Sequence, residues 1–222
     1  MIRHDGLAVS FALKEDIDFV VEGIMNSDKS GTKNNSYSQL FDLSEDELKG
    51  ILIDILNEDI PNSEFNLSSY LILKENDNPM GVLAMWNEGV GHLSNIQIKS
   101  NVLSYYIGRD KWAKAISKLQ AVSEIEIKRE PNTLQIESVY IRNEYRGRKL
   151  LKKIINFGQE YFSFQNEIIP DKMQVISLIE NKIAHKAFIN LGFQERYKTI
   201  SRNDEILSFY PGKGKVLFEK LI

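Results

Sequence analysis

The 222-residue sequence contains no cysteine, so it can form no disulfide and offers neither a thiolate ligand for zinc nor a cysteine nucleophile. Because such a chain suits a reducing compartment, we expect a cytoplasmic protein. Glycine (13) and proline (5) are scarce, which excludes a collagen-like repeat, and 42% hydrophobic residues exclude an intrinsically disordered chain. The sequence has no His-Glu-x-x-His or paired-carboxylate motif, so we predict no metal site.

Long hydrophobic runs and a strong charge of one sign are also missing. Residues 51–56 form one of the longest apolar runs, but Asp54 interrupts it, and a membrane helix needs roughly 18 apolar residues. The formal net charge is −3, which gives the whole molecule no attraction for nucleic acids or anionic membranes. We therefore expect neither as a partner.

The hydrophobic periodicity predicts a single domain over residues 1–222. Residues 27–38 are predicted to be a loop, and residues 89–131 an insertion or irregular region. The predicted strands are residues 7–13, 70–74, 80–86, 133–141, 173–179, 193–200, 206–210 and 215–221. The predicted helices are residues 17–26, a segment from Ser44 to Pro61, and residues 111–119, 150–162 and 181–191. This order of elements indicates an α+β protein.

The strongest local feature is a basic segment that follows the strand at 133–141. Between residues 142 and 153, six side chains are basic and one, Glu144, is acidic. The N-terminus of a helix carries unpaired N–H groups and the positive end of the helix dipole, so added basic side chains favour a bound anion. The segment therefore indicates a phosphate or pyrophosphate site, with a solvated basic turn as the alternative.

Two motifs resemble the GNAT superfamily of acetyl-CoA-dependent N-acetyltransferases. Residues 139–141 (VYI) followed by 145–148 (YRGR) are similar to the strand and pyrophosphate-binding turn of that family. Residues 181–193 (NKIAHKAFINLGF) match its Asn-x-x-Ala-x-x-x-Tyr-x-x-x-Gly-Phe helix except at Phe188. The resemblance covers residues 133–222 well, and the N-terminal half only through the order of its elements.

This resemblance implies an α/β/α sandwich with a mixed, mostly antiparallel central sheet, a V-shaped splay between two central strands, and helices on both faces. It also implies acetyl-CoA as the cofactor, with Asn181 near the pantetheine arm. The residues expected to bind the cofactor are Val139, Tyr140, Ile141, Arg146, Gly147, Arg148, Lys149, Leu150, Leu151, Asn181 and Phe188.

Three positions depart from the family pattern. Lys149 and Leu151 stand where the family has small residues, so their side chains crowd a place where glycine permits close approach to the cofactor. Phe188 stands where many members carry the tyrosine that protonates the leaving thiolate, and phenylalanine has no proton to give.

Acetyl transfer to an amine also requires a base, because an alkyl amine with a pKa near ~10.4 is protonated at neutral pH. Glu137 is the candidate, since GNAT members similar to spermidine/spermine and aminoglycoside acetyltransferases have an equivalent glutamate. We place it on the face that Val139 and Ile141 share. A backbone N–H near residues 139–141 would polarise the carbonyl. Tyr197 is a candidate proton donor in place of position 188, and Tyr210 and His185 are alternatives.

The acceptor is expected to be a small amine. Residues 42–64 contain eight acidic residues, and in the GNAT arrangement this segment borders the acceptor groove, which suggests a cationic acceptor. A solvated helix face is the alternative. We therefore predict an N-acyltransferase that is a monomer or homodimer. The competing hypotheses are a catalytically inactive acyl-CoA sensor and a nucleic-acid-binding domain.

Overall fold

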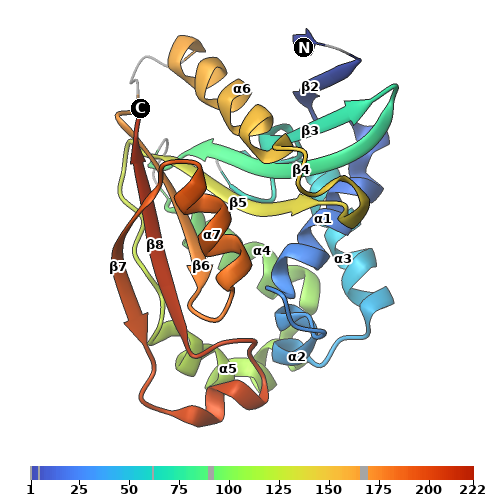
Figure 1. The fold of residues 1–222 in the computed structure, drawn as a ribbon. Coiled ribbons are helices and arrows are strands. Elements are labelled where there is room, and N and C mark those ends of the chain that lie inside the picture. The colour runs from blue at the N-terminus through green and yellow to red at the C-terminus, as the bar shows by residue number, and fades with distance from the viewer. Residues whose placement is uncertain (1, 5, 62, 90–92, 166–169) are drawn as a thin grey trace.

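The computed structural model describes residues 2–4, 6–61, 63–89, 93–165 and 170–222. Within them, eight strands form one sheet in the order β1-β2-β3-β4-β5-β6-β8-β7 (Figure 1). Of the seven neighbouring pairs, only β5 and β6 run parallel. The strands are β1 (Ile2–His4), β2 (Leu7–Phe11), β3 (Tyr70–Glu75), β4 (Asn78–Asn87), β5 (Leu134–Ile141), β6 (Lys172–Leu178), β7 (Gln194–Ile200) and β8 (Gly214–Leu221).

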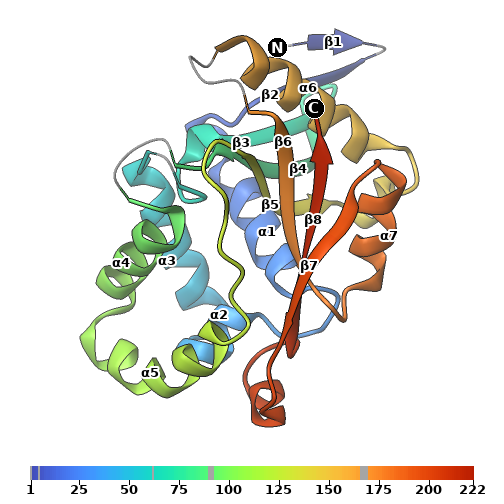
Figure 2. The same cartoon turned by 90° about the vertical axis from the view of Figure 1, so that its left-hand side faces the viewer.

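Helices cover both faces of this sheet, so the predicted fold class is confirmed (Figure 2). Five helices share one core with the sheet: α1 (Ile17–Asp28), α2 (Ser36–Phe41), α3 (Glu45–Glu58), α4 (Asn95–Ile107) and α5 (Arg109–Ser123). The opposite core contains α6 (Leu150–Gln165) and α7 (Lys182–Asn190). In the described part of the chain, no helix is long and apolar enough to cross a membrane.

Local sequence signals set several of these boundaries. The Ser44 hydroxyl accepts from the Glu47 N–H at 3.1 Å while the Glu47 carboxylate accepts from the Ser44 N–H at 2.8 Å, and this capping box begins α3. The Asn181 side chain accepts from the Ala184 N–H at 3.2 Å and begins α7. Both caps were predicted from the sequence.

Three segments differ from the prediction. The supposed loop at residues 27–38 contains the end of α1 and the start of α2, a helix of six residues that is too short to show a helical stripe. Residues 206–210 are not a strand, because a 3-10 helix spans Asp204–Ser208 and buries Ile206. Residues 89–131 hold two helices, α4 and α5, and residues 90–92 of that segment lie outside the described residues.

Strands β5 and β6 separate along their length. Residues Leu134–Ile136 pair with Met173–Val175, but beyond this point β5 pairs only with β4 and β6 only with β8. The predicted V-shaped splay therefore lies between these two strands. Because ladder hydrogen bonds are absent there, the sheet opens toward both of its faces.

A β-bulge at Ser138 sits at the start of the splay. Ser138 has a φ of 50°, and the register of β5 against β4 shifts between Val82 and Ala84. The bulge reverses the side-chain alternation, so Val139 and Ile141 pack in the core of α6 and α7 while Tyr140 packs in the opposite core. The prediction that Glu137 shares a face with Val139 and Ile141 is therefore wrong, since it assumed unbroken alternation.

Candidate active site

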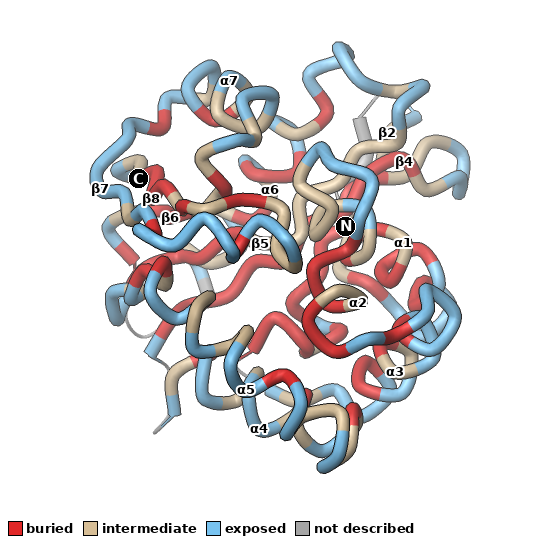
Figure 3. Tube along the Cα trace, turned by 90° about the horizontal axis from the view of Figure 1, so that it is seen from below, coloured by how far each residue is buried: buried red, intermediate tan, exposed pale blue. Residues whose placement is uncertain are grey.

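A cavity of about 600 Å³ lies at the point where β5 and β6 separate. Its wall includes both strands, α7 on one face of the sheet, and α1, α2, α4 and α5 on the other. Figure 3 shows these segments from below. Because α7 and α1 lie on opposite faces, the cavity passes through the sheet. The lining residues considered below are Asp28, Tyr37, Glu64, Lys99, Glu126, Arg129, Glu137, Val139, Asn181, Phe188, Tyr210 and Lys215.

The splay leaves backbone groups of β5 facing the cavity. The Arg142 N–H donates to the Met80 carbonyl at 2.9 Å. Because backbone N–H and C=O groups alternate in direction along a strand, those of residues 140 and 142 point toward β4. The backbone groups of Val139 and Ile141 consequently point away from β4, into the gap. Val139 lines the cavity, so its N–H is placed to donate to a ligand there.

The loop before α6 has the geometry of an anion site. Gly147 has a φ of 82° and Lys149 a φ of 58°, and the N–H groups of residues 147–149 have no acceptor among the described residues. The first-turn N–H groups of α6 follow directly. The Lys149 side chain is exposed to solvent, and the Leu151 side chain packs in the core. Neither side chain is buried over these N–H groups. The loop therefore fits a pyrophosphate.

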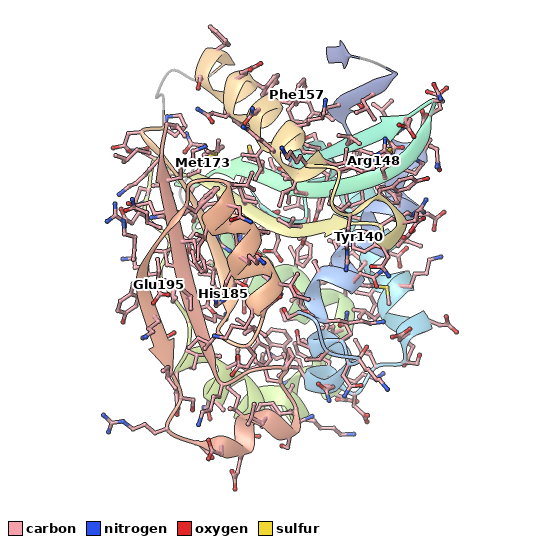
Figure 4. All side chains as sticks on the ribbon, in the orientation of Figure 1. Tyr140, Arg148, Phe157, Met173, His185 and Glu195 are labelled. Atoms are coloured by element: carbon pink, nitrogen blue, oxygen red, sulfur yellow. The ribbon has the colours of Figure 1, made fainter. Side chains whose placement is uncertain are left out.

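The basic side chains around this loop fall into two groups. Arg142 pairs with Glu22 at 2.7 Å and Arg148 with Glu75 at 2.7 Å, so both are neutralised by the chain itself. Figure 4 shows Arg148 near the end of the β3–β4 hairpin. The remaining four have no carboxylate partner among the described residues, so their positive charge is available to an anion. They are Arg146, Lys149, Lys152 and Lys153.

Helix α7 closes one side of the cavity. Asn181 caps the helix and also lines the cavity, so the two predicted roles are compatible. Phe188 lines the cavity as well, but it is 4% exposed and its ring packs on Phe193 and Phe218. Phe188 is therefore mainly a core residue.

Glu137 lies on the other side, bound to Arg129. One guanidinium nitrogen of Arg129 donates to Glu137 Oε1, and the other donates to Gln135 Oε1 at 2.5 Å. The guanidinium carbon lies 5.2 Å from the centre of the Trp86 ring. Arg129 thus fixes the Glu137 carboxylate and leaves Oε2 without a partner among the described residues. Arg129 was not identified from the sequence as a residue of the site.

A second ion pair, Lys99–Glu64, lies in the same wall at 2.5 Å. Burial alone would raise the pKa of Glu64, but the Lys99 ammonium brings it below its usual range. Burial alone would lower the pKa of Lys99, but Glu64 raises it well above its usual value. Both groups are therefore charged at neutral pH. Of the eight acidic residues at 42–64, only Glu64 lines the cavity, so the acidic segment does not form an acceptor groove.

Tyr70 lies in the same row of the sheet as Glu137. Tyr70 pairs with Ala84, and Ala84 pairs with Glu137, so the small Ala84 side chain separates the two. The Tyr70 ring is fully buried and its hydroxyl has no hydrogen-bond partner in bonding geometry among the described residues. The pKa of Tyr70 is raised, mainly by burial and then by the Glu64 charge. The nearby Ser138 hydroxyl acts in the opposite direction but does not cancel this rise. This buried hydroxyl was missed from the sequence.

The three candidate proton donors lie in different places. Tyr197 is 56% exposed on the edge strand β7 and does not line the cavity. His185 Nε2 lies 2.8 Å from the Leu178 carbonyl oxygen, and its ring packs on Phe218 between α7 and β8 (Figure 4). Only Tyr210 lines the cavity. Tyr197 therefore does not line the cavity that Glu137 lines.

No family model and no curated protein matches the sequence. Solved structures do match. An N-acetyltransferase from Staphylococcus aureus Mu50 is similar with a TM-score of 0.60 at 13% identity, over 96% of this chain and 100% of that one. A chimeric spermidine N-acetyltransferase from Vibrio cholerae gives 0.55 at 14% identity, over 98% and 96%.

A third similar structure is a putative acetyltransferase from Salmonella typhimurium with its cofactor acetyl-CoA. Its TM-score is 0.52 at 11% identity, over 98% of this chain and 94% of that one. Another, from Streptococcus pneumoniae, is an acetyltransferase of the GNAT family. The chain therefore has the fold of the GNAT superfamily, as the two sequence motifs indicated.

Proposed function

We propose that this protein is an acetyl-CoA-dependent N-acetyltransferase that acetylates a primary amine by direct attack in a ternary complex. The observation that carries the proposal is the cavity through the sheet. It joins the side where Asn181 and Phe188 lie to the side where Glu137 lies. A donor held on one face could thus meet an acceptor on the other within one cavity.

The chain's own groups suit this donor. The N–H groups of residues 147–149 and of the first turn of α6 would bind the pyrophosphate, with Arg146 and Lys149 adding positive charge. Val139 and Asn181 would hydrogen-bond the pantetheine arm. Leu150, 3% exposed, anchors the start of α6 in the core and so holds the loop in place. Acetyl-CoA supplies the acetyl group as a reactive thioester.

Glu137 is the proposed base. The acceptor amine must lose a proton as its nitrogen bonds to the acetyl carbon and the carbon–sulfur bond breaks. Arg129 holds Glu137 through Oε1, so the unpartnered Oε2 would take the proton, directly or through a water. Arg129 is a positioning residue in this scheme.

Two further steps need little from side chains. The N–H of Val139 would donate to the oxygen that gains negative charge in the transition state. A leaving thiolate with a pKa near ~8.5 needs no obligatory proton donor at neutral pH, so phenylalanine at position 188 is compatible with turnover. Of the three candidate proton donors, Tyr210 is the one that lines the cavity, and it replaces Tyr197 in the proposed site.

Amine-dependent release of thiol from acetyl-CoA tests this proposal. The chain has no cysteine, so a thiol-reactive dye reports only the coenzyme. We expect thiol release with at least one primary amine, with stoichiometric amide by mass spectrometry. Binding of acetyl-CoA without thiol release across a broad panel of amines and peptides would instead support the alternative of an inactive acyl-CoA sensor, which Phe188 favours.

A further inference from the structure

The acceptor side of the cavity has a wall of large apolar side chains. We name this the apolar wall; α2, α4 and α5 supply it, and its residues are Leu40, Phe41, Leu103, Trp112, Ile116 and Leu119. The Phe41 and Trp112 rings stack with centroids 5.3 Å apart and an interplanar angle of 16°. Ile116 is 47% exposed although it lines the cavity. Cavities lined mainly by apolar and aromatic side chains are typical of sites for apolar ligands.

The charged groups of the same cavity are already paired with one another. Lys99 binds Glu64 at 2.5 Å, Lys215 binds Glu126 at 2.5 Å, and Arg129 binds Glu137. The remaining charged residue, Asp28, accepts from the Ser36 N–H at 2.6 Å and from the Tyr37 N–H at 3.3 Å, and it also binds the Ser36 hydroxyl. The charged lining residues are therefore four acids against three bases, a net charge of −1.

This pairing limits the charge that an acceptor can carry. A polyamine would need a separate carboxylate for each ammonium group, and the carboxylates could be freed only by leaving the partly buried Lys99, Arg129 or Lys215 unpaired. An amino acid would need a free cation for its carboxylate, and all three basic residues are occupied. A single ammonium group matches the net charge of the cavity.

We propose that the acceptor is a primary monoamine on an aromatic or branched aliphatic body, with the amine toward Glu137 and the body against the apolar wall. This inference rests on the proposed acetyltransferase function and specifies its substrate class. It narrows the small cationic amine suggested by the acidic segment at residues 42–64 to a monoamine with an apolar body.

The test compares four amines at saturating acetyl-CoA: phenethylamine, isoamylamine, spermidine and a lysine-containing peptide. We expect kcat/KM for the two apolar monoamines to exceed that for spermidine and the peptide by roughly tenfold or more, since apolar contacts discriminate on this scale. Preferred turnover of spermidine or the peptide would overturn this inference and leave the acetyltransferase function standing. Absence of thiol release with every amine, despite acetyl-CoA binding, would overturn both.

A charge placed in the apolar wall sharpens the comparison. Ile116 is half-exposed, so Ile116→Glu is compatible with folding, and it adds an unpaired carboxylate beside the Phe41–Trp112 stack. We expect KM for phenethylamine to rise roughly tenfold and KM for spermidine to fall. The matched control is Tyr105→Glu, an 80% exposed position of α4 that does not line the cavity, where neither value should change. Equal effects of the two variants would overturn the proposal.

Discussion

In the proposed mechanism, Glu137 is the residue on which the chemistry depends most. It lies where the sheet opens, and Arg129 fixes one of its two carboxylate oxygens. The β-bulge at Ser138 decides which side of the sheet it serves, because without the bulge the β5 backbone would keep its ordinary alternation. A single residue with a positive φ thus separates the proposed base from the backbone groups that are proposed to bind the donor.

Replacing Glu137 by glutamine removes the base while keeping the shape and one hydrogen-bond acceptor for Arg129. We expect kcat to fall by roughly 10²- to 10⁴-fold, the usual contribution of general base catalysis, with acetyl-CoA affinity unchanged. Steady-state kinetics and calorimetry measure the two quantities. Glu130→Gln is the control, since Glu130 pairs with Lys172 outside the cavity. Equal losses in kcat and in donor affinity would contradict the role assigned to Glu137.

Glu64 sets a pH dependence of stability. Its pKa is lowered in the folded protein, so its ion pair with Lys99 stabilises the fold above the unfolded value of ~4.3 and is lost as the pH falls through the folded value. We expect urea unfolding to show a steep loss of stability as the pH falls below ~4.3. We expect Glu64→Gln to be less stable at pH 7, and its stability to depend less on acid. An identical acid dependence in the variant would show that Glu64 contributes nothing.

At the scale of elements, the position of α6 matters because its first turn is part of the proposed anion site. Gly158 lets this helix approach the sheet closely, since a Cβ there would lie 2.4 Å from Met85 Sδ and 2.7 Å from Leu71 Cδ1. Those neighbours are buried in the core. The close contact therefore fixes where the loop at residues 147–149 lies relative to β5.

Gly158→Ala is expected to lower the free energy of unfolding by about 1–3 kcal/mol through overpacking. Gly50→Ala is the matched control, because a Cβ at that helical position of α3 meets nothing within 4 Å. There the better helix propensity of alanine should stabilise the protein by about 0.5–1 kcal/mol. Denaturant unfolding measures both. Stabilisation by Gly158→Ala would mean that α6 does not pack closely on the sheet.

Several elements could be predicted from sequence because their signals are local. The capping box of Ser44 and Glu47 and the Asn181 cap need only neighbouring residues, and the basic turn with residues 181–193 indicated the GNAT fold. Helix α2 could not be predicted, since six residues show no helical period. The 3-10 helix with buried Ile206 has an apolar pattern that a short strand shares.

At the scale of the whole molecule, the cavity is a product of tertiary contacts that no local pattern specifies. Glu64, Lys99 and Arg129 come from three segments that are distant in the sequence, and tertiary packing brings their charges together in one cavity wall. The bulge depends on how β5 pairs with β4, so the face of Glu137 could not be predicted from alternation. The acidic composition of residues 42–64 proved misleading because all but Glu64 lie outside the cavity.

The most direct test of the account is isothermal titration of the purified protein with acetyl-CoA, together with the Arg146→Ala variant. We predict binding in the micromolar range for the natural sequence and clearly weaker binding for the variant, because in the proposed site the loop at 147–149 and the cavity hold the donor together. Absence of binding up to millimolar acetyl-CoA would contradict the central claim.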